Sequence, residues 1–198
     1  YTTASGRWSL RGFVLNGWQR IQRVHGNSSP AFGHQLTYTP SESWSFNSSS
    51  FIGNDKADSV KQVRYFHNLY ATYQATTKFG FIAGFDIGIE QQEKGSNAYN
   101  TWLTPTLMAR YKPNKKIAIA ARAEYYHDKK AVIVTTGTAN GFQTYGFSMN
   151  MDYYVLPAVV WRTEFRALSH TKDAIFVDRH NSFKKNSVTA TTAIAVNF

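Results

Sequence analysis

Ten segments of this chain alternate apolar and polar residues over about 9 to 14 positions each, which is the period of a β-strand. Most are longer than the roughly 5 to 6 residues usual in globular strands and match the about 9 to 11 that a tilted strand needs to cross a bilayer. The pattern predicts an all-β fold of about ten strands. These cover residues 8–16, 31–38, 44–53, 62–74, 79–91, 100–112, 116–127, 142–155, 158–169 and 186–198.

The links between these segments alternate in length. Four are tight, at residues 39–43, 75–78, 113–115 and 156–157, and five are longer and polar, at 17–30, 54–61, 92–99, 128–141 and 170–185. Outer-membrane barrels have short periplasmic turns and long extracellular loops, whereas a soluble β-sandwich gives no reason for the alternation. No run of 18 apolar residues is present, so a spanning helix is not expected.

One face of each predicted strand is apolar and the other is small, polar or charged. A barrel in lipid must carry its apolar face outside, although a soluble sandwich alternates as well. Tyr and Trp near the strand ends would suit the headgroup level, or reflect ordinary β-propensity. The predicted lipid-facing residues are Tyr145, Phe147, Met149, Met151, Tyr153, Trp161, Phe165, Ile194, Val196 and Phe198.

Charged residues within the strands are predicted to line the lumen, because a charge facing lipid at the midplane would cost about 2 to 4 kcal/mol. Two-residue spacing places Arg122 with Glu124, and Arg162 with Glu164 and Arg166, on single faces. Such a ladder could merely neutralise buried charge, or it could set a transverse field that screens solutes. The predicted lumen-lining residues are Arg64, Asp86, Glu90, Arg110, Arg122, Glu124, Asp152, Arg162, Glu164 and Arg166.

Other chemistries find little support in the sequence. The chain has no cysteine, and its six histidines show no ligand spacing, so no metal site is expected. Strand-borne carboxylates beside arginines do not form the acid pair of a glycosidase, and no nucleotide motif indicates a cofactor. The net charge of +10 arises largely from lysines in loops, turns and strand ends. That placement favours lipid phosphates or lipopolysaccharide over nucleic acid.

Five segments resemble the OmpL-like β-barrel porin family of Bacteroidota outer membranes. They are Asn16-Gly17-Trp18-Gln19, Phe51-Ile52-Gly53-Asn54-Asp55, Arg64-Tyr65-Phe66-His67-Asn68, Ala121 to Tyr126 with Asp128, and Trp161-Arg162-Thr163-Glu164-Phe165-Arg166. The resemblance implies an outer-membrane barrel without cofactor or catalytic residue. Family members are usually longer, so residues 1–198 are expected to be one domain forming the C-terminal part of a larger barrel. The terminal Phe198 resembles the signal read by the barrel-assembly machinery.

The leading hypothesis is a porin-like channel for passive diffusion of small polar solutes, and not an enzyme. The alternative is a non-conducting scaffold that docks other envelope proteins. A soluble β-sandwich binding module is the third possibility. Strand number matters, because about eight strands leave an interior filled by side chains whereas 16 to 18 leave an aqueous channel.

Overall fold

The computed structural model describes residues 1–197 of the chain. Ten long strands form one sheet: β1 (Trp8–Leu15), β2 (Ala31–Ser41), β3 (Trp44–Asn54), β4 (Val63–Gln74), β5 (Phe79–Gln91), β6 (Tyr99–Tyr111), β7 (Ile117–Asp128), β8 (Phe142–Leu156), β9 (Val159–His170) and β12 (Asn186–Val196). A 3-10 turn, η1 (Asp58–Val60), and a short hairpin, β10 (Phe176–Val177) with β11 (Phe183–Lys184), lie in the loops. No helix among these residues could cross a membrane.

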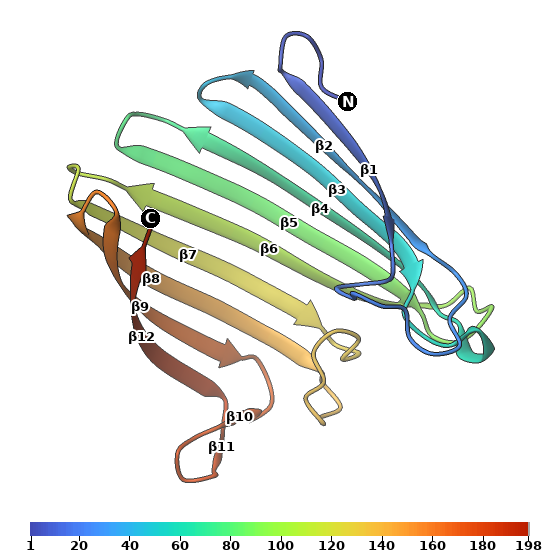
Figure 1. The fold of residues 1–198 in the computed structure, drawn as a ribbon. Coiled ribbons are helices and arrows are strands. Elements are labelled where there is room, and N and C mark those ends of the chain that lie inside the picture. The colour runs from blue at the N-terminus through green and yellow to red at the C-terminus, as the bar shows by residue number, and fades with distance from the viewer. Residues whose placement is uncertain (198) are drawn as a thin grey trace.

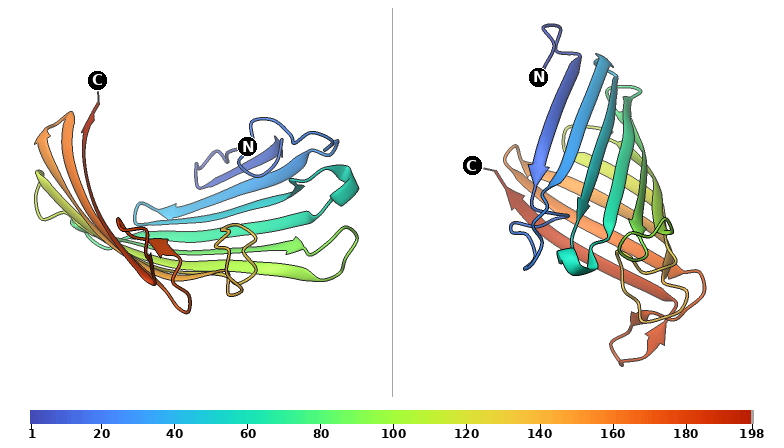
Figure 2. Two further views of the ribbon diagram at one scale, coloured as in Figure 1. Left: turned by 90° about the horizontal axis from the view of Figure 1, so that it is seen from below. Right: turned by 90° about the vertical axis from the view of Figure 1, so that its right-hand side faces the viewer.

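Every long strand pairs antiparallel with its neighbours, in the order β1 to β9 followed by β12 (Figure 1). The sheet curves into an open trough, and Figure 2 shows its two edge strands on opposite arms of the curve. Strands β1 and β12 are not paired with each other in the described chain. The first residues fold back along the free edge of β1, where Thr2 forms a bridge with Ser9.

The predicted antiparallel strands are confirmed, and most boundaries agree within two residues. Strand β5 has the predicted bounds, because strict alternation runs between a Thr-rich turn and a polar loop. Strand β2 runs past the predicted end through Pro40, where the register with β3 shifts between Tyr38 and Ser41. Proline is tolerated at such an irregularity, since it has no N–H to donate to the ladder. Strand β12 ends at Val196, and Phe198 lies outside the described residues.

The alternation of short and long connections is also confirmed by the strand bounds. All five long loops leave one rim of the trough, and the tight turns leave the other. Two loops contain structure that the sequence pattern did not predict. Residues 170–185 include the β10–β11 hairpin, and residues 54–61 include η1. Each is too short to show a hydrophobic period.

Candidate functional site

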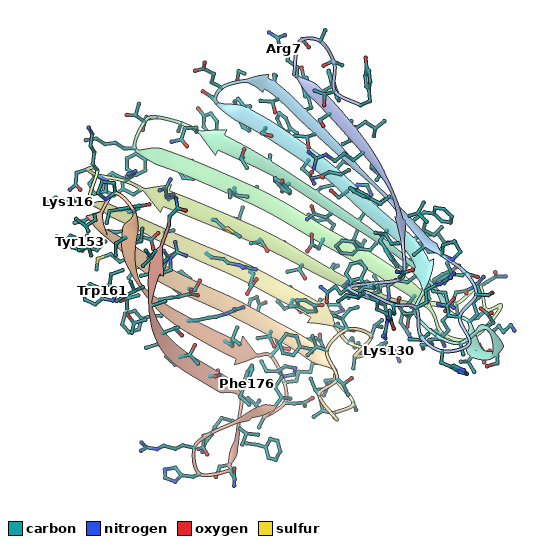
Figure 3. The ribbon with its side chains drawn as sticks, viewed as in Figure 1. Arg7, Lys116, Lys130, Tyr153, Trp161 and Phe176 are labelled. Carbon is teal, nitrogen blue, oxygen red and sulfur yellow. The ribbon has the colours of Figure 1, made fainter. Side chains whose placement is uncertain are left out.

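The two faces of the sheet differ in chemistry. Directly paired residues of antiparallel strands share a face, so the register assigns each side chain. On β8, Thr144 and Asp152 are buried on one face, whereas Tyr145 and Phe147 are more than half exposed on the other. The polar face is the concave one. In Figure 3, Tyr153 and Trp161 project outward from the left edge of the trough.

All ten residues predicted to line a lumen lie on the polar face. Pairing links Arg64 to Glu90, and Asp152 to Arg162, directly across neighbouring strands. The remaining members are Asp86, Arg110, Arg122, Glu124, Glu164 and Arg166, which follow the same registers. Seven of the ten belong to two charged clusters, and Asp86, Arg110 and Glu164 lie outside them.

The first cluster spans β7, β8 and β9. Arg162 donates two hydrogen bonds to the Asp152 carboxylate, from Nε to Oδ1 at 2.6 Å and from Nη2 to Oδ2 at 2.7 Å. Arg166 Nη2 donates to Glu124 Oε1 at 2.8 Å, and Arg122 pairs with the other oxygen of Glu124. Planar two-point pairing holds the Arg162 guanidinium in a fixed direction. We call Arg122, Arg162 and Arg166 the arginine row.

Exposure within these pairs is unequal. The side chains of Arg122, Arg162 and Arg166 are 41%, 56% and 44% exposed, whereas Glu124 and Asp152 are each 10% exposed. The carboxylates therefore lie beneath the guanidinium groups, close to the sheet. A solute in the trough meets positive charge first, although the cluster is partly neutralised underneath.

Three predicted lumen-lining residues, Asp86, Arg110 and Glu164, form no ion pair in the described structure. Glu164 pairs in register with Asn150, and Arg110 with Gly80 and Ala120, so no opposite charge sits directly across from either. The predicted ladder is thus a pair and a triad, since strand register offsets the other charges.

A polar wall, formed by Gln35, Asn47, Asn68 and Asp86, lies on the concave face of β2 to β5. Gln35 Nε2 donates to Asn47 Oδ1 at 3.1 Å, and Asn47 Nδ2 donates to Asn68 Oδ1 at 3.2 Å. Asn68 Nδ2 in turn donates to Asp86 Oδ1 at 2.5 Å. The wall is polar and faces the arginine row across the curve of the sheet.

The second charged cluster lies at the long-loop rim. Arg64 donates from Nη2 to Glu90 Oε2 at 2.6 Å and from Nη1 to Asp55 Oδ2 at 2.8 Å. Its guanidinium carbon lies 5.8 Å from the Trp18 ring centroid and 5.7 Å from that of Trp102. The strand pattern did not predict roles for Asp55, Trp18 or Trp102. Two of these residues occur in the segments that carried the family resemblance, which was the available signal.

The convex face carries the residues predicted to face lipid. Its rings stack along the short-turn rim, as in Trp8 on Tyr38 at 4.0 Å and Trp44 on Tyr73 at 4.3 Å between centroids. The predicted lipid-facing residues that the structure describes are Tyr145, Phe147, Met149, Met151, Tyr153, Trp161, Phe165, Ile194 and Val196, and all belong to this face.

Among residues 1–197, no three His, Asp or Glu side chains are grouped so that they could hold a metal ion. Buried Asp128 accepts backbone hydrogen bonds from Val132, Ile133 and Val134 at 2.8, 2.8 and 3.1 Å. This carboxylate organises the loop after β7, which explains its burial.

A family model described as "Putative beta-barrel porin-2, OmpL-like" matches residues 1–198. The chain belongs to this porin family. A solved structure titled "NanC porin structure in rhombohedral crystal form" is similar in fold, with a TM-score of 0.57 at 12% sequence identity, covering 96% of this chain and 93% of the other. The comparison with curated proteins found no match. Family membership places this OmpL-like porin in the bacterial outer membrane.

Proposed function

We propose that this porin is a passive diffusion channel for small polar solutes, with a preference for anions, and is not an enzyme. The observation that carries the proposal is the unequal exposure of the arginine row and its carboxylates on the concave face. Guanidinium groups that face water raise the local concentration of anions, because the field of fixed charges steers diffusing ions. The polar wall opposite adds hydrogen-bonding groups for uncharged polar solutes.

Two assays test this function. The protein, purified in detergent, is inserted into a planar bilayer in dilute potassium chloride, and into liposomes for swelling measurements with sugars. We expect discrete conductance steps, a reversal potential on the anion-selective side in a salt gradient, and swelling with monosaccharides. A folded protein that gives no conductance and no swelling would contradict the channel.

One observation favours the scaffold as a second candidate. A polar cluster lies on the mainly apolar convex face, where Ser48 Oγ is 3.0 Å from His67 Nε2 and Ser50 Oγ is 2.5 Å from His34 Nδ1. Polar groups facing lipid are costly and often mark contacts with other proteins. Under the scaffold hypothesis, His34→Leu with His67→Leu would release a co-purifying envelope protein while conductance stays absent in both forms.

A further inference from the structure

The loop of residues 16–30 is longer than its connection requires. Strands β1 and β2 are paired up to Leu15 and Ala31, and two strands that end as direct partners can be joined by about two to five residues. Surplus loop that packs in an ordered way over its own sheet is typical of functional loops. This loop returns to the sheet at the long-loop rim (Figure 1).

Trp18 brings the loop onto the concave face. Its ring meets Phe51 and Phe66 edge to face, with centroids 5.2 Å and 4.6 Å apart. Phe66 pairs in register with Gly88, and Gly88 pairs with Trp102. Because Arg64 and Glu90 occupy the same face, Trp18 lies on the side of the sheet that carries the arginine row.

Buried polar contacts fix this position. The Trp18 backbone N–H donates to Asp55 Oδ1 at 2.8 Å, and the other oxygen of Asp55 accepts from Arg64. The side chains of Arg64, Asp55 and Glu90 are each only 9% to 10% exposed. Gly17 has a φ of +133°, and a Cβ there would lie 2.5 Å from Asp55 Oδ1, so the approach requires glycine.

The far half of the loop is tied as well. Asn27 Nδ2 donates to the backbone oxygen of Asn54 at 2.6 Å, and Asn27 is buried. Asp58 N–H donates to the Gly26 oxygen at 2.9 Å, while its carboxylate accepts from the Ser28 N–H at 3.1 Å. A loop anchored near both ends behaves as a fixed wall and not as a swinging lid.

We propose that residues 16–30, held by Trp18, form a fixed constriction at the long-loop mouth that sets the largest solute the channel passes. The inference rests on the proposed channel function and adds a size-determining element to it. The anchoring network is balanced in charge, because Lys56 and Arg64 pair with Asp55 and Glu90. The loop itself carries exposed Arg20 and Arg23 and no acidic residue, so its effect on size is measured with neutral sugars.

Liposome swelling with neutral sugars of increasing size tests the constriction without interference from charge. Two variants are compared with the parent protein: Trp18→Ala, and a replacement of residues 17–29 by a two-residue Asn-Gly turn. A matched control is Trp44→Ala, which removes a ring of the same size from the convex face. Swelling rates for a trisaccharide are expressed relative to those for a monosaccharide.

We expect the relative trisaccharide rate to rise in both loop variants and to stay at the parent value in the control. Single-channel conductance should rise in parallel, while the reversal potential in a salt gradient remains unchanged in Trp18→Ala, which keeps the exposed Arg20 and Arg23 of the loop. Loop variants that conduct with the parent's size limit would overturn the constriction and leave the channel intact. A parent protein that neither conducts nor swells liposomes would instead overturn the channel function, and the constriction with it.

Discussion

Reversing two charges of the arginine row should turn the channel toward cations. The variant is Arg162→Glu with Arg166→Glu, chosen because these are the two most exposed guanidinium groups of the row, at 56% and 44%. Both project from β9 into the trough, so a permeating ion passes them in sequence. The substitution changes the fixed charge that the ion senses without changing the backbone.

The size of the shift follows from Coulomb's law. One unit charge acts on an ion about 10 Å away with roughly 0.4 kcal/mol in water, so a change of four charges gives about 1.7 kcal/mol. Screening over one Debye length at 0.1 M reduces this to about 0.6 kcal/mol, or about threefold in local ion concentration. The local concentration of cations rises by that factor, and the local concentration of anions falls by it. The permeability ratio should therefore shift by nearly tenfold at 0.1 M salt.

Stability should change little. Ion pairs with a water-exposed partner contribute about 0 to 1 kcal/mol each, because the exposed arginines keep much of their hydration. A companion variant, Arg162→Gln with Arg166→Gln, removes the pairs without placing new carboxylates near Asp152. It separates the loss of pairing from like-charge repulsion and should produce about half of the selectivity shift.

Reversal potentials in a planar bilayer measure the permeability ratio of cations to anions, and urea unfolding in detergent measures stability. The control is Arg179→Glu with Lys185→Glu, which makes the same change in net charge in the loop between β9 and β12. Its ratio should stay near the parent value. If conductance persists with an unchanged ratio while stability falls by several kcal/mol, the arginine row is structural and the reasoning is refuted.

Three further predictions concern packing, lipid contact and pH. Gly88→Ala should lower the unfolding free energy in detergent by about 1 to 3 kcal/mol, because a Cβ there would overlap the Trp102 ring, whereas Gly84→Ala meets nothing nearer than 3.7 Å and should be near neutral. Met149→Lys on the convex face should destabilise the protein in lipid by about 2 to 4 kcal/mol, and Asn150→Lys on the concave face by much less; equal losses would mean that the faces are misassigned. Hydrogen bonds from Ser28, mainly from its side chain and also from its backbone N–H, lower the pKa of Asp58 below its ordinary value of 3.8. The stabilisation that these hydrogen bonds give to loop docking is therefore complete above pH 3.8 and is lost as the pH falls through the lowered pKa. The amide shift of Ser28, followed by NMR, should titrate below 3.8, and Asp58→Asn should abolish the titration.

The strands and their faces were predictable because a single physical rule governs them. A residue in a sheet points to one side or the other, and a bilayer demands an apolar side, so alternation reports both the strand and its orientation. Strand β5 shows this, since Phe81, Phe85 and Ile87 alternate with Gly84 and Asp86. The shared face of Arg122, Glu124 and Arg166 follows from the same rule.

Pairing across strands was less predictable. Which carboxylate an arginine reaches depends on register, and register depends on turn geometry that a period of two does not encode. Arg162 meets Asp152 directly across β8 and β9, whereas Glu164 has only Asn150 opposite. The structure of the long loops could not be predicted from the two-residue period. Trp18 and Asp55 occupy irregular segments, where position is set by individual hydrogen bonds.

Aromatic residues on the concave face differ from the prediction that this face carries small, polar or charged side chains. Phe51, Phe66 and Trp102 share the face of the charged residues, where a water-filled lumen would favour polar groups. Their place is explained by Trp18, which packs on the two phenylalanines, and by Arg64, whose guanidinium contacts both tryptophan rings. Three of the segments that resembled the porin family meet at this point.

In the proposed channel, the determinants of size and of charge lie on different parts of the concave face. Arg162 and Asp152 lie near the tight turn that joins β8 to β9, whereas Arg64 and Glu90 lie where β4 begins and β5 ends, at the long-loop rim. Fields of opposite charges cancel when the groups are buried together, as at Arg64, and persist when the cation alone is exposed, as at Arg162. Under this proposal, sieving by size and sieving by charge require only different burial of the same kinds of ion pair.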